Sequence, residues 1–139
     1  MRTGSVLSGL TAVAGGLLVW RHWDDGTVID ASVGPAFGVV VGIEFAAAGI
    51  GAAFLAVRGK AHLMSAWIAF VVGVHLFPVA VLLEIPWLHV PAALVTVAAA
   101  AAPFLARKRG VLVSAVVGAT TGPILLVAAL ASLADALTR

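Results

Sequence analysis

The sequence of 139 residues contains no cysteine. That absence excludes disulfide bonds, thiol nucleophiles, iron–sulfur clusters and zinc sites built from thiolates. Charge is also scarce, because Asp, Glu, Lys and Arg make up only 10% of the chain, against about a quarter in soluble domains. Eight Lys and Arg against six Asp and Glu leave a net charge of +2, which is too small to form a basic patch for a nucleic acid. We therefore expect no nucleic-acid partner.

Hydrophobic residues, by contrast, make up 63% of the chain, and the mean hydropathy is +1.17. The few charges separate five apolar segments, each close to the roughly 20 residues that a helix needs to cross a bilayer. Strands of membrane barrels are shorter, at about 10 residues. The sequence therefore predicts an all-α integral membrane protein, a five-helix transmembrane bundle forming a single domain over residues 1–139. The predicted spans are 5–20, 34–57, 61–83, 88–106 and 111–133, with residues 21–33 as the outer loop.

The charged residues also predict the orientation of the bundle. With five spans, the N-terminus and two of the loops share one side of the membrane. That side carries six basic residues and no acidic one: Arg2, Arg58, Lys60, Arg107, Lys108 and Arg109. The opposite side mixes both signs: Arg21, Arg139, Asp24, Asp25, Asp30, Glu84 and Asp135. By the positive-inside rule, the N-terminus is expected in the cytoplasm and the C-terminus outside. The richness in Ala, Gly, Val and Arg favours a bacterial cytoplasmic (inner) membrane, which the chain crosses several times.

Two ionisable residues, Glu44 and His75, fall inside predicted spans. Such groups cost about 2.5–3.5 kcal/mol even on the lenient insertion scale, and they mark relays or binding sites more often than other membrane residues do. At about 1.5 Å per residue, Glu44 lies roughly 15 Å and His75 roughly 12 Å below the outer boundary. The similar depth makes a proton-transfer or coupling pair geometrically possible. The alternative is that each residue is neutral and hydrogen-bonded within ordinary packing.

Other polar residues lie at comparable depth in the predicted spans. Thr96, Thr120 and Thr121 are candidate substrate-binding residues, together with Trp67. Pro78 interrupts the third span and removes a helical hydrogen bond there. We therefore expect one mid-membrane polar cavity with Glu44 and His75 at its centre and these threonines in its wall.

Metal and haem sites are poorly supported by the histidine positions. His62 and His75 have a spacing that resembles paired haem ligands in b-type cytochromes, but each haem needs a facing histidine from another helix. The remaining histidines, His22 and His89, both lie at the outer end. Zinc needs three or four ligands, which Glu84 and His89 could complete only if helices bent. We expect no cofactor and no metal.

Small residues recur every fourth position on two of the spans, a spacing that lets helix backbones approach closely. They are Gly34, Gly38 and Gly42 on one span, and Ser114, Gly118 and Gly122 on another. The pattern is explained either by packing within one chain or by a parallel homo-oligomer.

The sequence leaves three functions open. The first is transport or conduction of a small substrate, a proton or a cation, with Glu44 as the exchanging site and His75 as its partner. The second is a membrane-embedded enzyme that performs acid–base chemistry, such as isomerisation, cyclisation or epoxide opening, on a lipophilic substrate. The third is a non-catalytic accessory subunit of a membrane complex. In each case the surrounding partner is the lipid bilayer, and the expected ligand is small and lipophilic or cationic.

Overall fold

The computed structural model describes residues 34–138, which form helices joined by short turns. The elements are α2 (Gly34–Val57), η1 (Ala61–Leu63), α3 (Met64–Leu82), η2 (Pro86–Leu88), α4 (His89–Arg109) and α5 (Val113–Thr138), where η denotes a 3-10 helix. Within this range no residue forms a strand. The all-helical prediction is therefore confirmed for the described part. The predicted span 5–20 and the outer loop 21–33 lie outside it.

Four helical stretches are long and apolar enough to cross a membrane: Gly34–Val57, Ala61–Leu82, Pro86–Arg109 and Val113–Ala134. They correspond to four of the five predicted spans. Two helices continue past the predicted ends: α4 reaches Arg109, and α5 reaches Thr138. The predicted bounds followed the apolar residues, whereas charged and polar residues such as Arg107, Lys108 and Arg109 can continue a helix.

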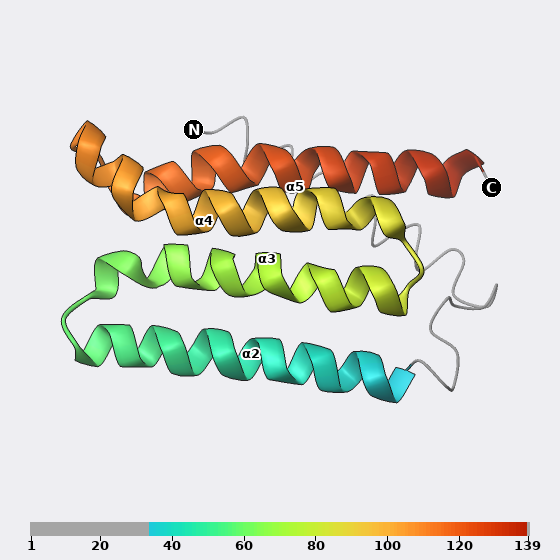
Figure 1. The fold of residues 1–139 in the computed structure, drawn as a ribbon, viewed down its shortest axis with the longest axis horizontal. Helices are drawn as coiled ribbons and strands as arrows, with labels where there is room; N and C mark the ends of the chain where they lie inside the picture. Colours follow the sequence, from blue (N-terminus) through green and yellow to red (C-terminus); the bar gives the residue numbers. More distant parts are fainter. Residues whose placement is uncertain (1–33, 139) are drawn as a thin grey trace.

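Consecutive helices run antiparallel, and α2, α3 and α4 lie side by side in a row (Figure 1). α5 packs on α4 and also touches α3. α2 therefore lies at the edge of the group and contacts one main neighbour, α3. Ala52 is its only buried residue among those described.

The packing centre lies on α4, whose alanine-rich sequence allows neighbouring helices to approach closely. Val95 and Ala102 are fully buried, and Ala99 is nearly so. α3 comes closest at Gly73, where an added Cβ would lie 2.7 Å from the backbone nitrogen of Thr96. Apolar packing between membrane helices gains little from the hydrophobic effect, so small residues stabilise it by allowing close van der Waals contact.

Glycines end two of the helices. Gly59 and Gly110 both have positive φ angles, of 68° and 65°, a conformation that costs glycine little and other residues more. After Gly59 the Lys60 N–H donates to the Leu55 carbonyl, and after Gly110 the Val111 N–H donates to the Ala106 carbonyl. These bonds satisfy carbonyls at the helix ends and allow the chain to reverse direction.

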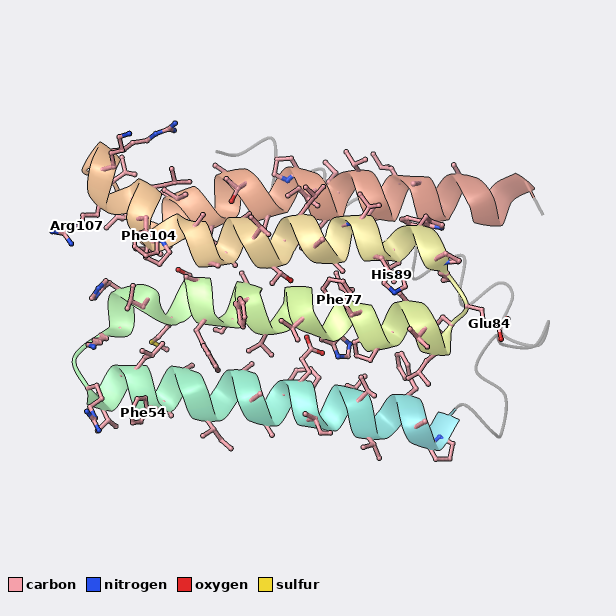
Figure 2. All side chains as sticks on the ribbon, viewed as in Figure 1. Phe54, Phe77, Glu84, His89, Phe104 and Arg107 are labelled. Atoms are coloured by element: carbon pink, nitrogen blue, oxygen red, sulfur yellow. The ribbon has the colours of Figure 1, made fainter. Side chains whose placement is uncertain are left out.

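The charged residues gather at opposite ends of the described helices. Both turns that contain a glycine lie at one end, with Arg58 and Lys60 beside one and Arg107 beside the other; Glu84 lies in the turn at the opposite end (Figure 2). Basic residues thus lie at one end of the described helices, and the acidic Glu84 lies at the other end.

Candidate functional site

The two ionisable residues of the predicted spans face each other between α2 and α3. Nε2 of His75 lies 3.3 Å from Oε2 of Glu44, which is within ion-pair distance. Both side chains are largely buried, with 12% of His75 and 17% of Glu44 exposed. Glu44 and His75 therefore form a pair near the middle of their helices.

The position of the pair follows from the length of the α2–α3 hairpin. Glu44 lies 15 residues before Gly59, and His75 lies 16 residues after it. Two antiparallel helices that rise by the same amount per residue bring such positions to the same level. The turn at Gly59 therefore sets the register, and helix rotation turns the two side chains towards each other.

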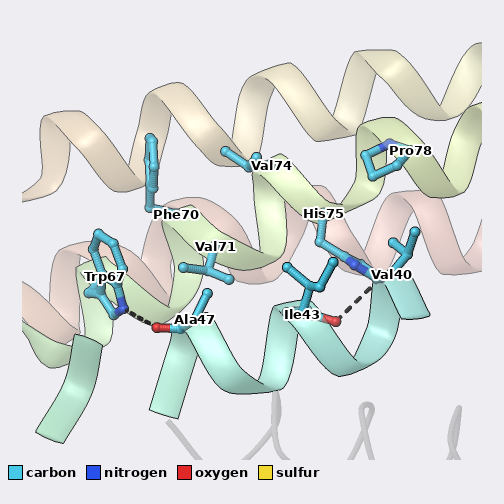
Figure 3. Close-up of a pocket in the computed structure, with 10 residues that line it drawn as sticks. Val40, Ile43, Ala47, Trp67, Phe70, Val71, Val74, His75 and Pro78 are labelled. Carbon is cyan, nitrogen blue, oxygen red and sulfur yellow. Dashed lines mark hydrogen bonds and ion pairs between the residues drawn. The ribbon is translucent and has the colours of Figure 1, made fainter. Parts of the chain in front are cut away.

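Beside the pair is a groove of about 300 Å³ between α2 and α3 (Figure 3). It is lined by Val40, Ile43, Glu44, Ala47, Trp67, Phe70, Val71, Val74, His75 and Pro78. Its volume is at the lower end of the range, about 300–1,000 Å³, of pockets that hold small organic ligands. Because α2 is an edge helix, the groove opens on the side of the bundle.

Trp67 and Phe70 form an aromatic wall at one end of the groove. The Trp67 indole Nε1–H donates to the Ala47 carbonyl at 3.0 Å, and the Trp67 ring stacks on Phe70 with 6.3 Å between centroids. The indole also lies directly against Gly51, where an added Cβ would overlap the ring. The ring is thus fixed by a hydrogen bond and by a glycine that leaves it room.

Pro78 interrupts the backbone hydrogen bonding of α3 beside the groove. Because proline has no N–H, the Val74 carbonyl lacks the donor that residue 78 of a regular helix would supply. Val74 and Pro78 both line the groove. The missing helical hydrogen bond of α3 therefore lies in the same stretch of helix as His75.

The groove has no fixed positive charge. Of the residues described, Glu44 and His75 are the only titratable ones in its lining. Arg58 places its guanidinium over the Phe54 ring at the basic end of α2, away from the pair. Within residues 34–138, His75 is therefore the one partner near the Glu44 carboxylate that can carry positive charge.

The predicted threonines lie elsewhere. Thr96 donates to the Ala92 carbonyl, Thr120 to the Val116 carbonyl and Thr121 to the Val117 carbonyl, each on its own helix. None of them lines the groove beside Glu44. The threonines therefore do not join Glu44 and His75 in the single polar cavity expected from the sequence. The position of a residue along a helix does not determine which way its side chain points. Trp67 does line the groove.

Among the described residues, His62, His89 and Glu84 do not join the pair; His22 lies outside them. Nδ1 of His89 lies 2.9 Å from the Pro86 carbonyl, and its ring meets the edge of Phe77; His62 and Glu84 are exposed. Within residues 34–138, no three His, Asp or Glu side chains come together as metal ligands.

A second groove, of about 510 Å³, runs between α4 and α5. Its lining contains no ionisable residue: Trp87, Val90, Pro91, Leu94, Pro123, Ile124, Val127, Ala128 and Ala131. It is larger than the first groove but offers no side chain for acid–base chemistry.

Phe70 and the Ala47 carbonyl were not anticipated from the sequence. Phe70 lies three residues after Trp67 and therefore on the same helix face, which is a signal that could have identified it. The Ala47 carbonyl carries no such signal, because every residue has one.

The fold and the site together define a class: an all-helical protein with the helix lengths and apolarity of a multi-pass membrane protein. No family model, no curated protein and no solved structure matches the chain.

Proposed function

We propose that this protein transports or conducts a small substrate, a proton or a cation across the membrane, with the Glu44–His75 pair as its proton-exchange site. The observation that carries the proposal is the 3.3 Å approach of the two side chains beside an open groove. A carboxyl and an imidazole within a membrane exchange protons at ordinary pH only if water or substrate reaches them. The groove supplies such a path.

The pair is better suited to exchange than to structural support. Replacing a buried ion pair by apolar side chains of similar volume is often neutral or stabilising. α2 gains few buried contacts at its edge position, so a costly polar pair there adds little to stability. An ionisable pair inside a membrane span is by default a candidate functional site, and a change of protonation state is the function that we propose for it.

The orientation is part of the same proposal. The basic end, with Arg58 and Lys108, faces the cytoplasm of a bacterial inner membrane, and Glu84 faces outside. Because the sequence has no cysteine, single-cysteine variants carry no background thiol. A membrane-impermeant maleimide applied to intact cells should label Glu84→Cys and leave Lys108→Cys unlabelled; the reverse pattern would overturn the orientation.

The exchange site is tested by infrared difference spectroscopy on the full chain, reconstituted in sealed vesicles with uniform orientation. When the pH is stepped from acidic to basic, one component of the carboxylic acid band, that of Glu44, should disappear. It should be absent in Glu44→Gln and retained in Glu84→Gln, the matched exposed control. A Glu44 carboxyl that stays in one state throughout would contradict the proposal.

The direction of access separates transport from catalysis. At a transport site, a pH step made outside the vesicles and a step made inside should each change the protonation of Glu44. A site that responds from one side only would exclude transport and favour the second candidate, an acid–base enzyme acting on a lipophilic substrate. The lateral opening and apolar lining of the groove are the specific observations that favour that second candidate.

A further inference from the structure

We infer that the α2–α3 groove binds a lipophilic organic cation, with its positive nitrogen at Glu44 and its apolar body along α3 towards Trp67. The inference rests on the proposed function and names the substrate class of the same site. Three properties support it: the charge of the groove lining, the shape of the groove and the proton balance of the Glu44–His75 pair.

The charge of the lining selects against other ligand classes. Glu44 supplies a carboxylate, and among the described residues no Lys or Arg lines the groove. An anionic ligand would meet an acceptor without a fixed cation to bind it. A sugar or another strongly polar ligand would lose its hydration against apolar side chains without replacing those hydrogen bonds. A cation, by contrast, is attracted by the Glu44 carboxylate.

The distribution of polar and apolar groups favours an elongated ligand. Phe70 precedes His75 by five residues and Trp67 precedes it by eight, which corresponds to about 7.5 Å and about 12 Å along a helix. The aromatic wall is therefore separated from the carboxylate by a stretch lined by Val71 and Val74. A cation with an aromatic group several carbons away would fill both ends.

The aromatic wall is already positioned for this contact. The N–H of Trp67 is occupied by the Ala47 carbonyl, so the indole offers a ligand its apolar surface and no free donor. Stacking on Phe70 fixes a second ring beside it. A preformed site of this kind saves the ligand the cost of ordering flexible side chains.

Proton balance links binding to the pair. With both ring nitrogens of His75 protonated, the imidazolium and the Glu44 carboxylate together are neutral. When a cation binds the Glu44 carboxylate, the Nε2–H proton leaves His75 for water, and the charge of the site is unchanged. Among the described residues, no other titratable or charged side chain faces the pair from α2 or α3. One cation enters for one proton released, and no bond other than N–H breaks.

The test uses 4-phenylbutyl(trimethyl)ammonium, a permanent cation that cannot release a proton of its own. Titration calorimetry on the full chain in lipid nanodiscs, in two buffers of different ionisation enthalpy, counts the protons released. We expect about one proton per cation bound where the pair is protonated, and up to about tenfold weaker binding per unit fall in pH. The neutral analogue, with tert-butyl in place of trimethylammonium, should bind at least roughly tenfold more weakly, a difference of about 1.4 kcal/mol.

Variants separate the site from partition into the lipid. Glu44→Gln should weaken cation binding at least roughly tenfold and abolish proton release, whereas Glu84→Gln, which alters an exposed acid in the α3–α4 turn, should leave both unchanged. Trp67→Leu should weaken binding and leave the proton count intact. Equal binding to wild type and Glu44→Gln, or binding without proton release, would overturn the inference.

The failure of this inference is distinguishable from the failure of the proposed function. If the infrared band of Glu44 titrates from both sides of the membrane but the ammonium probe does not bind, the substrate class is wrong and the exchange site stands. If the band does not change with pH at all, both the exchange site and the substrate class are wrong.

Discussion

α3 presents two different faces to its neighbours, one to α4 and one to α2. Gly73 and His75 are only two residues apart but lie on different faces. Gly73 faces α4, where the backbone nitrogen of Thr96 would lie 2.7 Å from an added Cβ. His75 faces α2 and forms an ion pair across an open groove. The α4 side is closed at Gly73 by direct contact, whereas the α2 side leaves a groove lined by larger residues such as Val71 and Val74. The difference shows that side-chain size, within a uniformly apolar helix, determines where a cavity can remain.

The same contrast separates the two grooves. The larger groove, between α4 and α5, is lined by apolar residues alone, whereas the smaller one contains Glu44 and His75. In a membrane, lipid chains can fill any apolar depression, so volume by itself indicates little. The ionisable pair is what distinguishes the α2–α3 groove as a candidate for chemistry.

The largest effect is expected where α3 and α4 touch. Gly73→Ala places a Cβ against the Thr96 backbone, which cannot move as easily as the end of a side chain, and should lower the free energy of unfolding by about 1–3 kcal/mol. Reversible unfolding in mixed micelles measures it. Gly42→Ala is the matched control, because its added Cβ meets nothing within 4 Å among the described residues. Equal losses for both variants would show that the close approach is not maintained.

A smaller effect is expected from the pair itself. A double-mutant cycle with Glu44→Leu, His75→Leu and the double variant should give an interaction free energy of about 0.5–2 kcal/mol, because each single change leaves one polar group without its partner. The double variant should be no less stable than either single variant. The same unfolding assay measures the cycle. Strict additivity would mean that the two side chains do not interact in the bilayer.

The smallest effect is expected from the threonines outside the groove. Thr120→Val removes a hydroxyl whose bonds run to carbonyls of its own helix, and should change stability by less than about 0.5 kcal/mol. Binding of the ammonium probe should not change, because Thr120 does not line the α2–α3 groove. A clear loss of binding would show that Thr120 lines the same cavity as Glu44, as expected from the sequence.

Much of the site could be anticipated from residue positions. Glu44 with Val40 and Ala47, and His75 with Val71, share helix faces by simple periodicity, and all of these residues line the groove. The similar depths of Glu44 and His75 followed from counting residues along two antiparallel helices. Thr96 and Thr120 were expected in the wall of the same cavity, but neither lines the groove. The position of a residue along a helix fixes one of its two coordinates, and the rotation of the helix fixes the other.

The sequence by itself determined the helices, because apolar segments of membrane-spanning length must satisfy their backbone hydrogen bonds internally. It also determined the ends, since Gly59 and Gly110 supply the positive φ angles and the charges flank them. Only the tertiary structure decided the rotation of each helix about its own axis. In spans that are apolar on every side, no hydrophobic face specifies that rotation. Close packing of small residues such as Gly73 specifies it instead, and that packing brings His75 to Glu44.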